Sequence, residues 1–282
     1  VEANITPKTK AIMAVDIFGH SVDMDALMSL AKRHNLKVIS DTAQAPGAFY
    51  HEKYAGTLAD IGGYSLNYHK HIHTGEGGIL VTNDDELAER MQLIRNHAEA
   101  VVEAKGVVNL NNMIGYNFRL GEIECAIGIE QLKKLGRLVE TRQKIADRLT
   151  DGLQGLSGLR LPIVRKDCTH VYYVYPMIVD VDKLGGSRGL IISALRAEGY
   201  VNTHLLPMYQ KKIAYGSNGF PWTLKEARHD VDYAKGICPV AETLHEKTFI
   251  GFQMCVHELS YDDIDLVINA FKKVWENLSD LS

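Results

Sequence analysis

Apolar residues near the start of the chain follow two different periods. Residues 11–15 and 37–40 are short apolar runs, which are typical of buried strands. Between them, residues 23–35 carry apolar side chains at helical spacing. This order predicts a βαβ unit with parallel strands and a right-handed crossover. Because ligands bind at the carboxyl ends of such strands, Asp16 and Asp41 are candidate site residues, and Asp41 is the better one.

The next segment predicts more of the same sheet. Residues 61–66 and 79–82 predict two strands, and the polar, glycine-rich run NYHKHIHTGEGG between them predicts a loop at the sheet edge. Asn83 predicts the cap of a helix that continues through Glu99, because three acidic residues follow it where the helix dipole favours negative charge.

The second half of the chain changes character. A long helix is expected from about residue 121 to residue 153, and it predicts a link between two domains. We therefore place residues 1–155 in a large α/β domain and residues 156–282 in a small α+β domain. The elements expected in the small domain are strands at 170–180, 200–205 and 248–255, helices at 189–199 and 224–235, and a last helix that begins with a capping box of Ser260 and Asp263.

Composition narrows the function classes. The chain has 282 residues, 46% of them hydrophobic, and a net charge of -4, so no basic surface argues for nucleic acid or an anionic membrane. No apolar run approaches the roughly 20 residues of a membrane span. No signal peptide is visible, so we expect a cytoplasmic protein. The chain does not begin with methionine, so we expect it to be part of a longer one. The cysteines are far apart and predict reduced thiols: Cys125, Cys168, Cys238 and Cys255.

Lys70 lies in the predicted loop, between His69 and His71 and ahead of a glycine turn. A lysine amine condenses with a carbonyl group only when it is unprotonated, and burial with cationic neighbours lowers its pKa toward that state. The residues alone still favour an exposed lysine on a polar loop, because surface lysines are common.

Asp41 follows a predicted buried strand in the run VISDTAQAPGA, and Gln44 comes three residues later. Pyridoxal phosphate acts as an electron sink when its ring nitrogen stays protonated, and a carboxylate at a strand end enforces that state. Gln44 could reach the phenolic oxygen of the same ring. An Asp after a strand is as often a turn residue or a helix cap, so the evidence for a site comes from the combination with Lys70.

Three runs together resemble a known family: VISDTAQAPGAFY, then GTLADIGGYSLNYHKHIHTGEGGILVTNDDELAERMQLIRNH, then GYNFRLGEIECAIGIEQL. The chain is similar over essentially its whole length to the DegT/DnrJ/EryC1/StrS aminotransferases. The resemblance implies fold type I of the pyridoxal-phosphate transferases, which resembles aspartate aminotransferase. In that α/β fold a three-layer large domain has a mainly parallel sheet, and a smaller α+β domain follows.

Carried over residue by residue, the resemblance implies a cofactor site. Lys70 would hold pyridoxal 5'-phosphate as a Schiff base, and Asp41 would pair with the pyridine nitrogen. Gln44 would lie beside the ring, and Ser65 would hydrogen-bond the phosphate. Asn117 would reach the phosphate of the partner subunit in a homodimer with shared active sites.

Some positions depart from the family pattern. Tyr68 and His69 stand where a proline and a small residue are usual, and His71 stands where Asn is commoner. His69 and His71 are candidate substrate contacts. His204 and Tyr209, which the resemblance places in a loop on the substrate side, are two further candidates. The family's N-terminal segment, with its phosphate-binding turn and stacking aromatic residue, does not precede residue 11, so we expect a fragment.

The function that the resemblance implies is amine transfer from glutamate or glutamine to a keto sugar. A nucleotide-linked 4-keto or 3-keto deoxyhexose in surface-polysaccharide or natural-product biosynthesis is expected, with a keto-cyclitol as the alternative acceptor. The retained lysine implies transamination instead of the dehydration seen in relatives that replace it by histidine.

Two other functions stay open. One is a catalytically inactive or regulatory protein of the same fold. The other is a metal hydrolase, because His69, His71 and His73 would share one face of an extended strand, although we expect a loop and no metal there. Tyr172, Tyr173 and Tyr175 alternate in the same way and predict core packing.

Overall fold

The computed structural model describes residues 1–98, 113–195, 212, 220–225, 227, 231–256 and 258–281. Two compact units divide the chain. The first unit consists of Val1–Asp147, Ile163–Val174 and Gln253–Leu259, and the second of Arg148–Pro162, Tyr175–Phe252 and Ser260–Ser282. Two late segments thus join the first unit, whereas the division near residue 155 into two domains stays a prediction.

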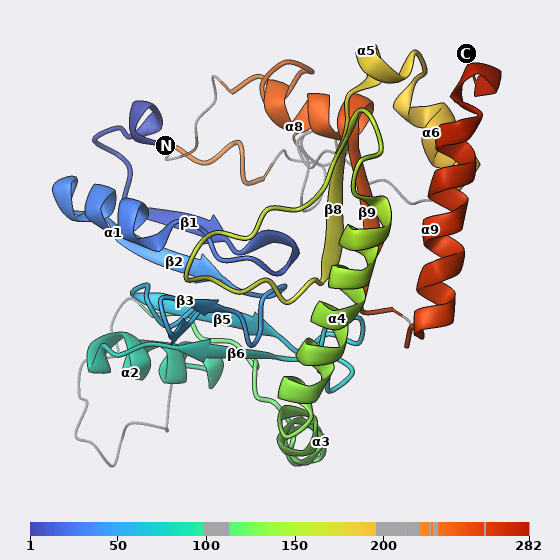
Figure 1. Ribbon diagram of the computed structural model, residues 1–282. Coiled ribbons are helices and arrows are strands. Elements are labelled where there is room, and N and C mark those ends of the chain that lie inside the picture. Colours follow the sequence, from blue (N-terminus) through green and yellow to red (C-terminus); the bar gives the residue numbers. More distant parts are fainter. Residues whose placement is uncertain are drawn as a thin grey trace. The chain divides into compact units, whose positions relative to one another are not determined.

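The first unit contains a sheet in the order β1-β2-β5-β6 (Figure 1). β1 and β2 are parallel, β5 runs parallel to β2, and β6 is antiparallel to β5. The predicted βαβ unit is therefore confirmed. The strands are β1 (Ala11–Val15), β2 (Lys37–Asp41), β5 (Ile61–Ser65) and β6 (Gly78–Val81), and a separate hairpin is formed by β3 (Phe49–Tyr50) and β4 (Lys53–Tyr54).

The two faces of this sheet differ in burial. Helix α1 (Met24–Arg33) covers one of them, and its Met24 packs with Ile12 and the fully buried Val38. We call this the closed face. The side chains that alternate with these along the strands lie on the open face, where Met13 is 66% exposed. Asp41 and Ile39 follow the same alternation and belong to the open face.

Two helical predictions need correction. Helix α2 (Asp85–Arg95) begins after Asp84, whose carboxylate accepts from the backbone of Glu86 and Leu87, so the cap is not Asn83. The expected long helix is divided into α3 (Glu122–Leu132) and α4 (Leu135–Leu153). At the junction the hydrogen bonding tightens, because Lys134 N donates to Gln131 O, three residues earlier.

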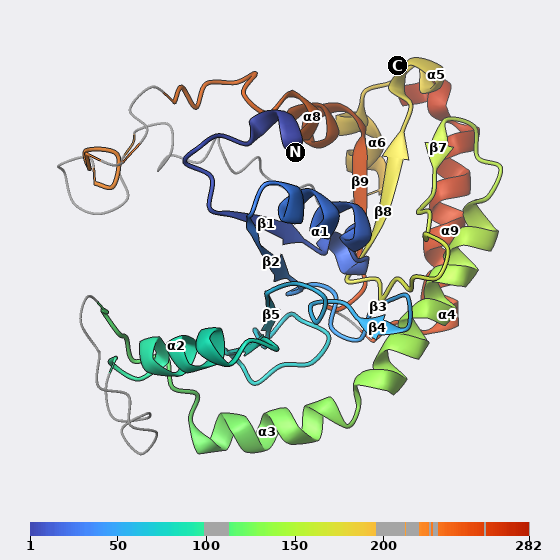
Figure 2. The ribbon, with the colours of Figure 1, turned by 90° about the vertical axis from the view of Figure 1, so that its left-hand side faces the viewer.

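The second unit is built on β7 (Leu159–Arg160), β8 (Val174–Val179) and β9 (Phe249–Gln253), whose first and last members flank β8 (Figure 2). Helix α9 (Tyr261–Glu276) starts with the predicted capping box of Ser260 and Asp263. Its apolar stripe is buried at Ile264, Ile268 and Phe271.

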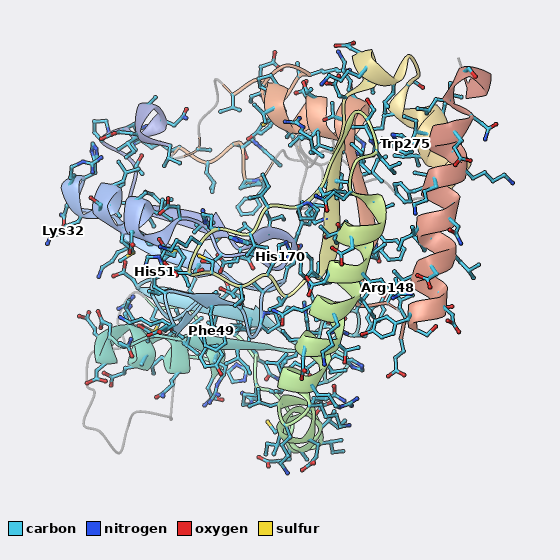
Figure 3. All side chains as sticks on the ribbon, viewed as in Figure 1. Lys32, Phe49, His51, Arg148, His170 and Trp275 are labelled. Carbon is cyan, nitrogen blue, oxygen red and sulfur yellow. The ribbon has the colours of Figure 1, made fainter. Side chains whose placement is uncertain are left out.

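Contacts within the second unit join α9 to neighbouring segments. The Arg148 guanidinium on α4 makes a bidentate ion pair with the Asp265 carboxylate, and Trp275 Nε1 donates to Ser157 O at 2.8 Å; Arg148 and Trp275 are labelled in Figure 3. The other helices among the described residues of the second unit are α5 (Val181–Leu184), α6 (Arg188–Leu195), α8 (Pro239–Thr243), η5 (Leu244–Thr248) and η6 (Leu278–Leu281); η1 (Glu2–Asn4) and η2 (Ile17–Gly19) belong to the first unit.

Two further predictions concern residues between α6 and α8. The described residues of 224–235 form turns and irregular backbone, so the helix expected there is wrong for that part of the chain. The strand expected at 200–205 lies outside the described residues.

Candidate active site

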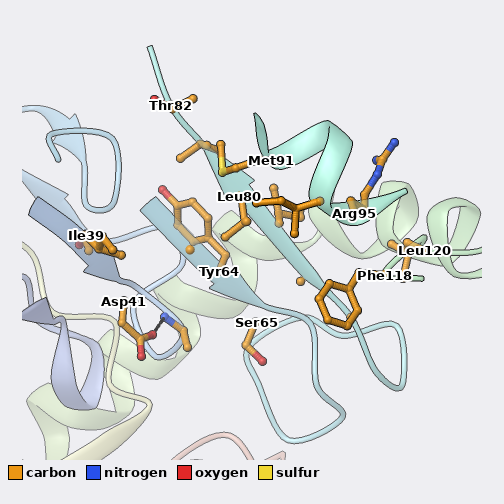
Figure 4. A pocket seen from close by; sticks show the side chains of 18 of the residues that line it. Ile39, Asp41, Tyr64, Ser65, Leu80, Thr82, Met91, Arg95, Phe118 and Leu120 are labelled. Atoms are coloured by element: carbon orange, nitrogen blue, oxygen red, sulfur yellow. Dashed lines mark hydrogen bonds between the residues drawn. The ribbon is translucent and has the colours of Figure 1, made fainter. Parts of the chain in front are cut away.

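A groove of about 1170 Å³ opens on the open face of the first unit's sheet (Figure 4). Strands β2, β5 and β6 line its floor, and Met91 and Arg95 of α2 line one side. Asp41 and Ser65 lie at the carboxyl ends of β2 and β5, where they line the same groove. Polar groups at neighbouring strand ends of an open α/β sheet are the expected setting for a ligand site.

Asp16 is not part of this groove, although it also follows a strand. Its carboxylate is fully buried and accepts from Val22 N at 2.9 Å, Ser40 Oγ at 2.9 Å and Thr42 Oγ1 at 2.7 Å. These donors satisfy the charge inside the fold. Its candidacy for the site is therefore wrong, and its role is structural.

Asp41, one strand further, is half-buried, and its Oδ1 accepts from Ala43 N at 3.1 Å. Its backbone is fixed on both sides by the register with Val15 of β1 and Gly63 of β5. The carboxylate is thus positioned by the sheet while its oxygens remain available to a ligand in the groove.

Lys70 lies on the loop between β5 and β6, with its backbone N bonded to Asn67 O at 3.0 Å. Its amine is half-buried and rests 4.6 Å from the centroid of the Tyr173 ring. Burial lowers the pKa of Lys70, and the charge of the Asp41 carboxylate acts in the opposite direction. A lysine with a lowered pKa within electrostatic range of a carboxylate has the features of a site for carbonyl chemistry.

The histidines around Lys70 lie in different environments. His71 is only 3% exposed, its Nε2 lies 2.9 Å from Val171 O, and burial lowers its pKa to about 3. This contact with the protein interior supports a structural role for His71 better than contact with a substrate. His69 lies nearer the surface, where partial burial and the Lys70 charge lower its pKa. His73 is exposed.

The extended strand on which a histidine metal site would depend is absent, because residues 68–72 form turns and bends. Within the described part of the chain, no group of three or more His, Cys, Asp and Glu side chains could hold a metal ion. The geometric premise of the hydrolase hypothesis is therefore wrong.

Gln44 and Ser65 have hydrogen bonds that test the fit of a cofactor. Gln44 Oε1 accepts from Phe18 N at 2.7 Å, which turns its Nε2 donor away from that bond. Ser65 Oγ accepts from Asn67 N at 3.2 Å, which leaves its hydroxyl proton to donate. A phenolic oxygen and a phosphate both need donors, and these side chains can supply them. Together with the Lys70 amine and the Asp41 carboxylate, this set fits pyridoxal phosphate.

The groove lining does not include Lys70, Gln44 or Asn117. Asn117 is exposed and forms a backbone bridge with Asn96. His204 and Tyr209 lie outside the described residues. Asn117, His204 and Tyr209 therefore stay predictions.

Tyr172 and Tyr173 precede β8, and Tyr175 lies within it. Tyr175 is fully buried and contacts Thr150 through its hydroxyl at 2.7 Å, and Tyr172 is 7% exposed, so core packing is confirmed for both. Tyr173 precedes the strand and instead lies beside Lys70. The alternating pattern does not predict this contact, because it contains no information about the loop that the Tyr173 ring contacts.

An open, mainly parallel α/β sheet, with the Asp41 carboxylate at the end of β2 and Lys70 on the loop after β5, fits the class of fold type I pyridoxal-phosphate enzymes. The DegT/DnrJ/EryC1/StrS aminotransferase family model matches residues 1–272, and the chain belongs to that family.

Comparisons with single proteins agree with this assignment. The chain is 40% identical to dTDP-3-amino-3,4,6-trideoxy-alpha-D-glucose transaminase of Micromonospora megalomicea subsp. nigra over 97% of its own length and 68% of that protein. It is 34% identical to GDP-perosamine synthase of Caulobacter vibrioides over 74% and 57% of the two lengths. The structure of S. venezuelae DesV in complex with a ketimine intermediate has a TM-score of 0.76 and 29% identity, over 98% of this chain and 68% of that one.

These matches confirm the predicted family, fold class, enzyme class and cofactor at the level of the family. They also confirm that its members include transaminases of nucleotide-linked sugars. The chain spans 57% to 68% of the two curated relatives' lengths, so the activity of a whole protein is a matter for proposal. Among the described helices, none combines the length and apolarity of a membrane span.

Proposed function

We propose that this chain is the cofactor-binding part of a pyridoxal-phosphate aminotransferase that moves an amino group from glutamate or glutamine to a nucleotide-linked keto sugar. A 4-keto or 3-keto deoxyhexose is the acceptor class, in surface-polysaccharide or natural-product sugar biosynthesis. The relatives named for dTDP-linked and GDP-linked sugars support this class. A keto-cyclitol is the alternative acceptor.

One observation carries the proposal. The Lys70 amine is half-buried, its pKa is lowered by that burial, and Asp41 is near enough for its charge to act on the amine. A carbonyl cofactor needs an unprotonated amine for attachment, and its pyridine ring needs a carboxylate partner. Asp41 supplies the carboxylate from the end of β2, and Lys70 supplies the amine from the loop between β5 and β6.

The chain's own residues would divide the work as follows. The cofactor, when bound, supplies an aldehyde that condenses with amines and a ring that accepts electrons. Lys70 Nζ would hold the aldehyde and, once released, would accept and return a proton. The Asp41 carboxylate would keep the pyridine nitrogen protonated. Gln44 Nε2 would donate to the phenolic oxygen, and the Ser65 hydroxyl would donate to the phosphate.

A homodimer with shared sites is part of this proposal. Helix α3 exposes Ile123 at 76% and Ile129 at 60%, and the neighbouring rings of Tyr116 and Phe118 stack on each other and are also exposed. Such apolar exposure favours a protein partner. Asn117 lies between these two rings in the sequence, so a subunit docked here would receive its amide.

The cell compartment and the substrate contacts are also proposed. A cytoplasmic enzyme is supported by the free cysteines of the structure. His69, His204 and Tyr209 are proposed contacts for the sugar nucleotide, and His69 has support from its place beside Lys70.

The test is covalent labelling of the protein with pyridoxal phosphate and borohydride, followed by peptide mapping. We expect the label on Lys70 and its loss in Lys70→Ala. The matched control is Lys53→Ala, which removes an exposed lysine of the same unit and should keep the label. Equal labelling of Lys70→Ala and the unaltered protein would end the proposal.

A second stage separates the enzyme from a regulatory protein of the same fold. The unaltered protein, not treated with borohydride, is incubated with pyridoxal phosphate and then with glutamate; the absorbance of the bound cofactor should fall and a keto acid should be released. Attachment at Lys70 without release of a keto acid would favour the regulatory function.

A further inference from the structure

The ring of Tyr173 lies against the loop that carries the reactive lysine. Lys70 Nζ is 4.6 Å from the ring centroid, within the range of a cation–π interaction. The rings of His69 and His71 lie at centroid distances of 6.1 and 6.2 Å from the same ring. One aromatic side chain thus contacts or approaches three consecutive residues of the loop.

The backbone at Tyr173 is held from several directions. Tyr173 O accepts from Met254 N at 3.2 Å, and Val171 N donates to Gly19 O at 2.9 Å. Gly19 has φ of +108°, and a Cβ there would lie 3.0 Å from Tyr173 N, so a glycine is needed for this close approach. Because His71 Nε2 also bonds Val171 O, the ring and the lysine loop are fixed to the same short segment.

We propose that Tyr173 is a positioning residue whose ring face holds the free Lys70 ammonium in place. This inference rests on the proposed function only for its catalytic consequence. When the lysine is released from the cofactor and accepts a proton, the ammonium has a defined place to rest, from which it can return that proton to the same position. The negative ring face stabilises the protonated amine.

Other groups that face the amine do not replace this ring. Asp41 on β2 acts on the amine through its charge. Cys255 is also near, but burial raises its pKa to about 11, so the thiol is uncharged near neutral pH. His69 on the same loop has a lowered pKa and is neutral there as well. The ring and the Asp41 carboxylate therefore stabilise the cation from two different elements.

The experiment measures the amine without any cofactor. Lys70 acylation by acetic anhydride is followed across pH by peptide mass, with the exposed Lys53 as the internal reference. Removing the ring in Tyr173→Leu should raise the acid dissociation constant of Lys70 about three-fold, because the cation loses its partner. Tyr173→Phe keeps the ring and should leave that constant unchanged.

The matched control is Tyr68→Leu, which removes a 68% exposed ring two residues before the lysine and should also leave the constant unchanged. If Tyr173→Leu does not fold, pentafluorophenylalanine at position 173 keeps the ring shape, reverses the charge of its face and should produce the same rise. An unchanged constant in the folded ring-altered variant, or an equal rise in Tyr173→Phe, would overturn the proposal.

A kinetic measurement then tests the catalytic consequence. In Tyr173→Leu loaded with pyridoxal phosphate, amine transfer from glutamate should slow several-fold while the affinity for the cofactor stays unchanged. Failure of attachment at Lys70 would count against the proposed function and leave the acylation result intact. A normal transfer rate in Tyr173→Leu would count against the positioning role alone.

Discussion

The closed and open faces of the first unit's sheet are made by alternate residues of the same strands. The closed face packs into the core, and the open face lines a groove. Val38 of β2 is fully buried on the closed face, whereas Ile39 and Asp41 of the same strand line the groove on the open face. Because successive side chains point to opposite faces, one strand can contribute to the core and to a site at once. The five residues of β2 therefore contribute to the stability of the fold on one face and to the candidate site on the other.

The contrast is sharpest for the carboxylates that follow β1 and end β2. Asp16 is buried with three donors, and Asp41 is half-buried and faces the groove. The same residue type at neighbouring strand ends therefore has a structural role in one case and a proposed catalytic environment in the other. Burial and hydrogen-bond partners, and not residue type, decide between them.

The largest expected effect is a loss of activity on changing Asp41 of the open face. Asp41→Asn should lower the rate of amine transfer on the order of 100-fold, because the charge that keeps the ring nitrogen protonated is lost. The free energy of unfolding should change by less than about 1 kcal/mol, since the side chain is only half-buried. Single-turnover kinetics and urea unfolding measure the two quantities. A fall in both by similar free energies would break the comparison.

Asp16→Asn is the reverse case. The substitution should lower the free energy of unfolding by about 2 to 3 kcal/mol, because an amide cannot accept all the hydrogen bonds that the buried carboxylate accepts. Urea unfolding measures the loss. Attachment of pyridoxal phosphate to the folded variant should be retained, and loss of attachment without loss of stability would contradict a purely structural Asp16.

A pH titration tests the burial of His71, the residue after Lys70. Burial lowers the pKa of His71 and of His170 to about 3, against about 6.5 in an unfolded chain. The unfolded state therefore binds more protons between these values, so stability is full above pH ~6.5 and falls as the pH drops toward ~3.

The expected loss is about 1.4 kcal/mol for each histidine at one pH unit below the unfolded pKa. Urea unfolding at several pH values measures it. His71→Gln should reduce the slope, and His73→Gln, which alters an exposed histidine of the same loop, should not. Equal slopes for the two variants would show that the burial of His71 does not control acid stability.

The smallest expected difference is between two neighbouring apolar residues of β2. Val38→Ala should lower the free energy of unfolding by about 2 kcal/mol, because it leaves a cavity under α1. Ile39→Ala should cost less than about 1 kcal/mol, since the open face has room around that side chain. Similar costs would mean that the open face is packed as firmly as the closed one.

Much of this architecture could be predicted from the sequence. Strands β1 and β2 and helix α1 follow from strong apolar periodicity, and the capping box at Ser260 from a local pattern. The local patterns predicted the wrong residue where two neighbours could cap the same helix, and the wrong boundary where contacts distant in the sequence determine where a strand begins. Asp84 caps α2 in place of Asn83, and the strand expected from residue 170 begins only at Val174.

Residue types and their order determined the family, the parallel βαβ unit and the candidacy of Lys70, because hydrophobic periodicity and motif spacing are local properties of the chain. The tertiary structure decided that Asp16 is locked inside while Asp41 faces a groove, that His71 is buried, and that the Tyr173 ring lies beside the lysine amine. These outcomes depend on segments about 25 to 100 residues apart meeting in space. Burial and partner geometry are set by such meetings, and no local pattern contains them.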